Sequence, residues 1–371
     1  MVEFKKIKKN FGFGCMRLPM QGDKIDIVEF KKMVDYFMES GFNYFDTAHP
    51  YHGGDSEIAL KEGLTSRYPR DSYVLVNKLS GNMFKCAEDI PKVLDEQLEI
   101  CGVDYFDIYL MHAQERKKYE FYKKNHAYET AFELKKQGKI KHVGLSFHDK
   151  ASVLDKILTE YPEIEIVQIQ FNYLDYYDPS IEGKECYEVC LKHNKPIVIM
   201  EPVKGGSLVN LPDEAQNILD NLNGGSNASY ALRYCAGFKN VIMTISGMGN
   251  MDMMTDNIAT MKECKPLSEE ETEALIKVKD IIVKQSLIPC TACKYCVDGC
   301  PQNIPIPEIF SLYNDYKTFK SWNTEYLYGI QTKTGGKASS CIGCGACENS
   351  CPQHIEIINE LKKAANVFDV K

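Results

Sequence analysis

The chain has 371 residues, enough for two or more domains of about 100–200 residues each. Its 44 Lys and Arg residues against 52 Asp and Glu residues give a net charge of −8, which argues against a nucleic-acid-binding face because such faces are basic. The N-terminal residues include Lys but no apolar signal-peptide core, and no apolar run reaches the about 18 residues of a membrane span. We therefore expect a cytoplasmic protein without nucleic-acid or membrane partners.

Short β-rich runs alternate with stretches of helical period up to about residue 265. Helical stretches such as 27–40 and 89–101 separate strand candidates, several of which are apolar throughout, as in parallel strands buried on both faces. The strand candidates are 11–18, 43–47, 73–79, 107–112, 142–148, 166–172, 196–202 and 241–247. Eight strand–helix units over about 250 residues predict an α/β fold, the (β/α)8 barrel. A doubly wound open sheet is the alternative, although its G-x-G-x-x-G fingerprint is absent.

Cysteine is concentrated near the C-terminus: of 15 cysteines, eight lie between residues 290 and 351. They form two runs of the pattern C-x2-C-x2-C-x3-C, each followed by Pro. The first run is Cys290, Cys293, Cys296 and Cys300, and the second is Cys341, Cys344, Cys347 and Cys351. This duplicated spacing is the signature of bacterial ferredoxins with two [4Fe–4S] clusters, in which the fourth cysteine of each run binds the other cluster.

The signature predicts which cysteines share a cluster. One set is Cys290, Cys293, Cys296 and Cys351, and the other is Cys341, Cys344, Cys347 and Cys300. Two structural zinc sites are the alternative, though these usually pair C-x-x-C units across a longer loop. We expect three parts in the chain: the barrel over residues 1–266, a connecting helix over 267–287, and an α-helical ferredoxin-like domain over 288–371.

Three predicted strands end in residues that can carry acid–base chemistry, and active sites of such barrels lie at these strand ends. Asp46, Lys78 and His112 hold these positions, and Tyr51 follows Asp46 in the next loop. A Lys ammonium held by Asp is expected to lower the pKa of a nearby Tyr from its usual value of about 10. Tyr51 could then protonate a carbonyl oxygen that a neutral His112 orients. Taken singly, each residue also fits a purely structural role.

The motifs FDTAHPYHGGDSE (45–57), VNKLS (76–80), YLMHA (109–113) and VGLSFH (143–148), with the eightfold pattern, resemble the aldo-keto reductase family. With its tail, the chain is similar to the ferredoxin-fused branch of that family. The resemblance implies a nicotinamide-dependent oxidoreductase that reduces an aldehyde or ketone. It assigns Tyr51 as general acid, Lys78 and Asp46 as its supporting pair, and His112 as the residue that orients the carbonyl.

The resemblance also implies where NAD(H) or NADP(H) binds. The expected contacts are Ser146 and Gln168 for the carboxamide; Met200 and Glu201 beside the ring; Val203, Lys204, Gly205 and Gly206 for the pyrophosphate; Gly247, Met248 and Asn257 toward the adenosine; and Gly14, Cys15 and Met16 beside the cofactor. Phe147 stands where the family often has Asn, and Met200 where it often has an aromatic residue. Residues 246–257 contain no Lys or Arg for a 2′-phosphate, which favours NAD.

The two electron chemistries leave alternatives open. A nicotinamide delivers a hydride and each cluster passes one electron, so direct exchange needs a carrier of both, usually flavin, for which the sequence has no diagnostic motif. The clusters could relay electrons from an external ferredoxin or other redox partner to the barrel, with or without a flavin at its strand ends, or be structural or sensory in an ordinary carbonyl reductase. A catalytically idle, nucleotide-sensing partner subunit is a further alternative, against which the complete set of four site residues argues.

Overall fold

The computed structural model describes residues 4–179, 181–222, 224–285, 287–319 and 324–369. Contacts divide the chain into two compact units, one of Met1–Pro202 with Ala228–Ser268 and one of Val203–Asn227 with Glu269–Lys371. The second unit takes in the segment Val203–Asn227 because helix α8 (Asp213–Asp220) packs against helix α11 (Glu269–Lys284). In the described part of the chain, no helix combines the length and apolar character that crossing a bilayer requires.

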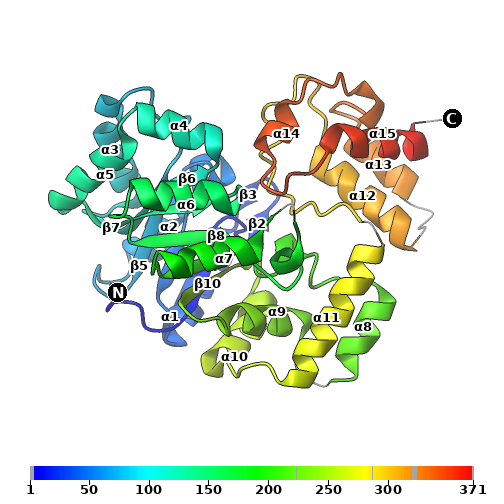
Figure 1. Cartoon of the computed structure of the whole chain (residues 1–371), viewed down its shortest axis with the longest axis horizontal. Helices are drawn as coiled ribbons and strands as arrows, with labels where there is room; N and C mark the ends of the chain where they lie inside the picture. Colours follow the sequence, from blue (N-terminus) through cyan, green and yellow to red (C-terminus); the bar gives the residue numbers. More distant parts are fainter. Residues whose placement is uncertain (1–3, 180, 223, 286, 320–323, 370–371) are drawn as a thin grey trace. The chain divides into compact units, whose positions relative to one another are not determined.

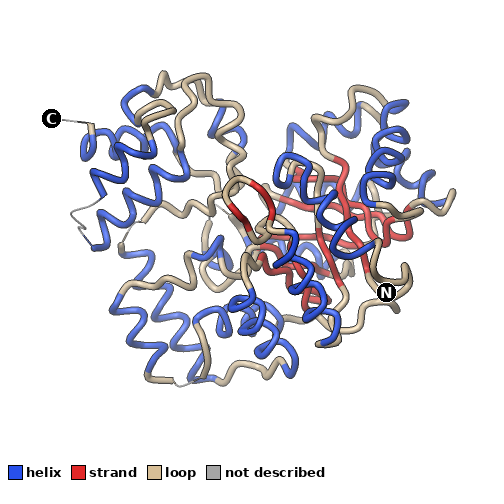
Figure 2. Tube along the Cα trace, turned by 180° about the vertical axis from the view of Figure 1, so that it is seen from behind, coloured by secondary structure: helices blue, strands red, loops and turns tan. Residues whose placement is uncertain are grey.

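The first unit is a closed barrel of eight parallel strands, which confirms the predicted fold (Figures 1 and 2). The strands are β1 (Phe11–Gly14), β4 (Tyr44–Asp46), β5 (Val74–Leu79), β6 (Phe106–Gln114), β7 (Ile140–Phe147), β8 (Ile166–Gln170), β9 (Ile197–Met200) and β10 (Val241–Gly247). Consecutive strands are neighbours, and β1 closes the barrel between β10 and β4. A short antiparallel hairpin of β2 (Met20–Gln21) and β3 (Lys24–Ile25) follows β1 and was not expected from the sequence.

Helices surround the strands (Figure 2). They are α1 (Ile27–Glu39), α2 (Asp55–Leu60), α3 (Ile90–Cys101), α4 (Arg116–Lys124), α5 (Ala127–Lys136), α6 (Ala151–Glu160), α7 (Gly183–Lys192), α9 (Asn227–Ala236) and α10 (Met251–Glu263). Helix α1 shows how the sequence sets their positions. The Asp26 carboxylate accepts the first free amides of α1, and the buried residues Phe30, Met33, Val34 and Phe37 recur at helical spacing. An amphipathic helix of this kind is held by its buried face.

The inside of the barrel is apolar toward the strand N-termini and polar toward the strand C-termini. The part toward the strand N-termini is filled by an apolar cluster. Its members are Tyr44, Val74, Val76, Ile108, Leu110, Ile166, Val198, Met243 and Ile245. Because side chains alternate along a strand, the next inward position on β4 is Asp46, on β5 Lys78 and on β6 His112. The predicted catalytic side chains thus share the layer at the C-terminal end, where barrels of this type carry their active sites.

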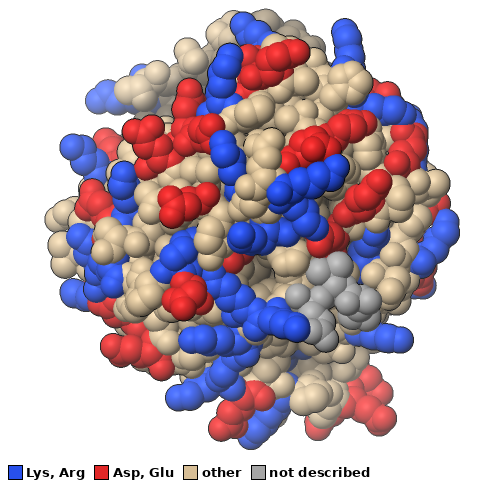
Figure 3. Space-filling model, turned by 90° about the vertical axis from the view of Figure 1, so that its left-hand side faces the viewer, with Lys and Arg blue, Asp and Glu red and all other residues tan. Residues whose placement is uncertain are grey.

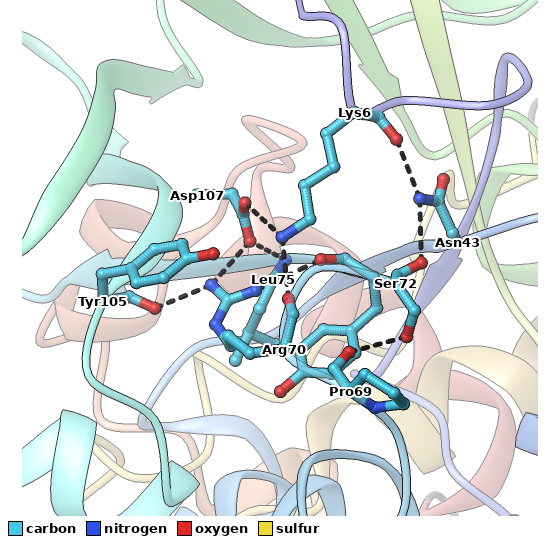
Figure 4. Close-up of polar contacts among 9 residues, drawn as sticks. Lys6, Asn43, Pro69, Arg70, Ser72, Leu75, Tyr105 and Asp107 are labelled. Atoms are coloured by element: carbon cyan, nitrogen blue, oxygen red, sulfur yellow. Dashed lines mark hydrogen bonds and ion pairs between the residues drawn. The ribbon is translucent and has the colours of Figure 1, made fainter.

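A charged network lies at the N-terminal ends of strands β5 and β6 (Figure 4). The Asp107 carboxylate accepts hydrogen bonds from Lys6 Nζ at 2.9 Å, Arg70 Nη2 at 2.7 Å and the Leu75 amide at 2.8 Å. These contacts tie the N-terminal segment to the starts of β5 and β6. Figure 3 shows Lys and Arg side chains gathered in a band on one face, with Asp and Glu side chains on both sides of it.

The second unit is helical, as expected from the sequence. Besides α8 and α11 it contains α12 (Ile306–Phe319), α13 (Thr324–Gln331), α14 (Ala346–Ser350) and α15 (Ile357–Phe368). Helix α12 packs against α13 and α15. The apolar core of this unit includes Ile304, Ile309, Phe310 and Leu361. The connecting helix expected over 267–287 is found as α11.

Candidate active site and cluster sites

The four residues predicted for catalysis lie together at the C-terminal ends of the barrel strands. Lys78 Nζ lies 2.6 Å from Asp46 Oδ1 and donates to the Thr47 carbonyl at 2.8 Å. The third polar neighbour of this ammonium is the Tyr51 hydroxyl, 3.2 Å away. The Tyr51 and His112 rings meet edge to face, with centroids 6.1 Å apart. The site therefore holds a phenol between a paired ammonium and an imidazole.

In the chain without ligands, burial determines the protonation states of Tyr51 and His112. It raises the pKa of Tyr51 well above 10, with further increases from the charges of Asp46 and Glu201. The direction of the Tyr51 pKa is therefore opposite to the expected one in the free chain, and the charge that acts against the rise is that of Arg17. Burial, followed by the charge of Lys78, holds the pKa of His112 well below 6.5. At neutral pH the site thus presents a protonated phenol and a neutral imidazole.

Ser80 fixes the orientation of His112. The register of β5 and β6 places Lys78 beside Leu110, and two residues further on Ser80 lies beside His112. Ser80 Oγ and His112 Nδ1 are 2.7 Å apart, and both residues are buried. With Nδ1 engaged by the serine, Nε2 is the ring nitrogen left for a substrate oxygen. The serine was part of the quoted motif VNKLS, but its role was not predicted.

A buried carboxylate supports the strand that carries Lys78. Glu57 on α2 is fully buried, and its Oε1 accepts from Asn77 Nδ2 at 2.7 Å and from Gln97 Nε2 at 3.1 Å. Its Oε2 lies 2.7 Å from His49 Nδ1. Gln97 also donates to the Lys78 carbonyl at 3.2 Å. Buried hydrogen-bond networks of this kind restrict the backbone that they join, so Glu57 helps to hold Lys78 in place.

The pair predicted to bind a nicotinamide carboxamide is suitably placed for it. Ser146, near the end of β7, and Gln168, in the middle of β8, are register partners. Gln168 is buried, and its Oε1 has no hydrogen-bond partner among the described residues. Ser146 Oγ accepts from the Ala113 amide at 2.7 Å, so its own proton is still available to donate. A buried, unsatisfied amide oxygen is costly unless a ligand completes it, and a carboxamide NH2 can do so.

The remaining predicted contacts of the first unit surround the same strand ends. Gly14, at the end of β1, pairs with both Asp46 and Gly247, and Cys15 and Met248 are fully buried nearby. Asn257 on α10 donates to Ser246 Oγ at 3.2 Å. Met16 follows Cys15, and Met200 ends β9. These residues thus lie on, beside or just after the adjoining strands β1, β9 and β10, and their contacts with a cofactor stay a prediction.

Arg17 is a charged residue of this region that sequence reasoning missed. Its Nη2 lies 3.8 Å from Glu201 Oε1, and its side chain lies against Gly247, where an added Cβ would come within 3.2 Å of Arg17 Cβ. The loop after β1 therefore brings a cation beside the loop after β10, whose own residues 246–257 have no Lys or Arg. The neighbouring segment had been recognised only for its place after the first strand.

The predicted pyrophosphate segment, residues 203–206, belongs to the second unit. Lys204 and Gly205 have the positive φ values 47° and 63°. A Cβ on Gly205 would come within 2.6 Å of the Thr291 carbonyl oxygen, so only glycine fits this approach. Lys204 is buried, and its Nζ donates to Gln353 Oε1 at 3.0 Å. The side chain of Lys204 thus points into the cysteine-rich unit, which the sequence pattern had not indicated.

Two cavities in the second unit bring together the two predicted sets of cysteines. We call them site one, lined by Cys290, Cys293, Cys296 and Cys351, and site two, lined by Cys300, Cys341, Cys344 and Cys347. Each has a volume of about 310 Å³, is partly open to solvent, and is otherwise lined largely by apolar side chains. In the described part of the chain, no three His, Cys, Asp or Glu side chains converge on a single metal ion. The thiols instead surround a space, as a cluster with one ligand on each iron requires.

Comparison with known proteins identifies both units. The family model "Aldo/keto reductase family" matches residues 10–280, and "4Fe-4S dicluster domain" matches residues 289–356. The NADH-specific methylglyoxal reductase of Escherichia coli (strain K12) is 26% identical over 195 residues, which are 47% of this chain and 57% of that protein. The chain therefore spans less than two thirds of the length of that relative. An uncharacterized oxidoreductase, YqkF, of Bacillus subtilis (strain 168) is 24% identical over 300 residues, which are 71% of this chain and 90% of that protein.

A solved structure agrees in fold with the barrel. The holo form of an aldo-keto reductase from Bacillus halodurans superposes with a TM-score of 0.60 at 24% identity, covering 72% of this chain and 91% of that chain. The closed barrel and the family match over residues 10–280 lead to one conclusion. The chain belongs to the aldo/keto reductase family and carries a 4Fe-4S dicluster domain after its barrel.

Proposed function

We propose that the barrel reduces an aldehyde or ketone to an alcohol with a nicotinamide cofactor. The observation that carries this proposal is the Tyr51 hydroxyl at 3.2 Å from Lys78 Nζ, which is itself paired with Asp46 at 2.6 Å. The bound nicotinamide supplies the hydride that the carbonyl carbon needs. The chain supplies the proton and the binding site.

Each of the four residues has a defined part in this reaction. Tyr51 gives its proton to the carbonyl oxygen as that oxygen gains negative charge. The phenolate left behind is stabilised by the Lys78 ammonium, whose contact with the Tyr51 hydroxyl is already formed. Asp46 holds that ammonium in place, and neutral His112 donates a hydrogen bond to the same carbonyl oxygen from the ring nitrogen that Ser80 leaves available. Carbonyl and proton donor are thereby fixed before hydride arrives.

We further propose that the cofactor is NADH, held as the resemblance implies. Its carboxamide would lie between Ser146 and Gln168, where an amide oxygen is buried without a partner. The absence of Lys and Arg from residues 246–257 disfavours a 2′-phosphate there, and the E. coli relative is named as NADH-specific. Arg17 is the nearby cation that could reverse this preference. Titration with NADH and NADPH tests it: tighter binding of NADPH would refute the proposal.

The proton-donor role is tested by Tyr51→Phe in full-length, anaerobically purified protein. NADH oxidation is followed with a panel of aldehydes and ketones that includes methylglyoxal, the substrate in the name of the E. coli relative. Loss of the general acid should lower kcat by about 10²–10⁴-fold and leave NADH binding unchanged. Tyr36→Phe on α1, which changes the same side chain outside the site, serves as the control. Equal rates for Tyr51→Phe and the unchanged protein would remove Tyr51 from the role.

For the second unit we propose two [4Fe–4S] clusters, one in site one and one in site two. The two cavities and their four thiols each support this assignment over zinc. Iron and sulfide analysis of brown, anaerobic protein should find about eight irons per chain, the content of two such clusters. Colourless protein with bound zinc would refute the clusters. Denaturing the same sample and looking for a released yellow chromophore tests for a bound flavin.

A further inference from the structure

The two cysteine runs continue into a structural repeat. Cys300-Pro-Gln-x-Ile-x-Ile306 and Cys351-Pro-Gln-x-Ile-x-Ile357 have the same pattern, and each leads into a helix, α12 or α15. The backbone repeats as well: φ is positive at Ala292 and Lys294 in the first run and at Gly343 and Gly345 in the second. Ile306 lines both cavities. The two sites are therefore near copies with one shared wall.

Lys204 makes these two sites unequal. In the repeat, Gln302 of site two corresponds to Gln353 of site one. Gln302 is exposed, but Gln353 is only 4% exposed, and it accepts a hydrogen bond from the Lys204 ammonium at 3.0 Å. Gln353 lines site one and comes two residues after Cys351, one of the four cysteines of that site. Site one thus has a buried cation beside it.

Among the described residues that line the two sites, no charged side chain is buried as Lys204 is. Lys294 also lines site one, but its side chain is 68% exposed and lies 3.4 Å from Glu308, so solvent and its partner screen it. The described residues that line site two include no Lys, Arg, Asp or Glu. A charge shielded from water acts more strongly on its surroundings than an exposed one. Lys204 is therefore the charge best placed to distinguish the two sites.

We propose that Lys204 raises the reduction potential of the cluster in site one, so that this cluster is reduced in preference to the cluster in site two. Taking up one electron adds one negative charge to a cluster, and a buried ammonium beside it stabilises the reduced form. Lys204 comes four residues after Met200, the end of strand β9, in the segment expected to hold the cofactor pyrophosphate. Lys204 is thus itself one of the residues predicted to contact the pyrophosphate, but its ammonium donates to Gln353 of the cysteine-rich unit.

This inference rests on the proposed clusters, and the experiment separates the two failures. Full-length, anaerobic Lys204→Met protein is compared with the unchanged protein by redox titration followed by electron paramagnetic resonance. Iron and sulfide content is measured on the same samples. One of the two midpoint potentials should fall, so that at a fixed potential the ratio of reduced to oxidised cluster drops about tenfold, or about 59 mV. The second potential should change less. Lys204→Arg, which keeps the charge, should stay near the original value.

Lys294→Met is the matched control, because it removes a lysine that lines site one at an exposed position. If Lys204→Met does not bind its clusters, Lys204→Gln, which can still donate to Gln353, decides the question. Fully loaded protein with unchanged potentials in the neutral variant would overturn the inference. Equal shifts of both potentials, or an equal shift in Lys294→Met, would do the same. Absence of clusters from the unchanged protein would instead refute the cluster proposal itself.

Discussion

Removal of the Lys78 ammonium should lower the unfolding free energy of the protein more than most single substitutions do. Its ammonium lies 2.6 Å from Asp46, and the two side chains are only 1% and 4% exposed. In Lys78→Met the Asp46 carboxylate remains buried without its cation. Breaking a buried pair in this way costs about 3–5 kcal/mol of unfolding free energy at neutral pH. Lys136→Met breaks a pair of similar length between side chains that are 72% and 62% exposed, and should cost no more than about 0.5 kcal/mol.

The stability lost in Lys78→Met is also expected to depend on pH, in a direction that the pKa of Asp46 determines. Burial raises the pKa of Asp46, and the opposing effect of Lys78 is lost in the variant. Folded Lys78→Met therefore keeps a proton on Asp46 at pH values where the unfolded chain has released it. Its stability should fall as pH rises above about 4, the ordinary pKa of Asp, until the folded carboxyl also ionises. The deficit relative to the unchanged protein is thus smallest in acid.

Urea unfolding followed by far-ultraviolet circular dichroism measures these differences at a series of pH values. The double variant Lys78→Met/Asp46→Asn completes the cycle, and it should recover much of the lost stability because no uncompensated charge remains. A deficit that is no larger than that of Lys136→Met would refute the reasoning. So would a deficit that does not change with pH, since the buried carboxylate would then not be its source.

Three further predictions concern the barrel. Asp107→Asn weakens the network at its N-terminal end and should lower the unfolding free energy by about 2–3 kcal/mol in urea unfolding. Gly144→Ala places a Cβ 2.4 Å from a side chain on β8 and should cost about 1–3 kcal/mol, whereas Gly249→Ala, with open space around it, should change stability by less than about 0.5 kcal/mol. Ser80→Ala releases His112 and should lower kcat/KM about tenfold with NADH binding unchanged; unaltered kinetics would show that the serine does not position the imidazole.

The parts of the structure that depend on local pattern were predictable. The eight strands and the four site residues could be located because buried parallel strands are apolar runs, and polar residues at their ends stand out. Cysteine spacing likewise predicted which four thiols surround each cavity. Both signals lie within short stretches of chain, so neither needs knowledge of distant contacts.

The parts that depend on distant contacts were not predictable. Lys204 and Gln353 are far apart in sequence, and nothing near either residue indicates that they meet. Placing Ser80 beside His112 requires the register of β5 and β6. The pKa of Tyr51 was predicted with the wrong sign because the neighbouring Lys78 is visible in a motif, whereas the depth of burial emerges only when the loop has folded over the strand ends.

Cys300 and Cys351 each line the cavity whose other three cysteines come from the other run, and this affects how the cysteine-rich unit forms. Each cavity takes three thiols from one run and the fourth from the other. Neither half can therefore complete a site by itself, and a chain truncated between the runs lacks ligands for both. In the proposed arrangement, neither cluster can gain its four thiolate ligands until both runs have been made and folded together.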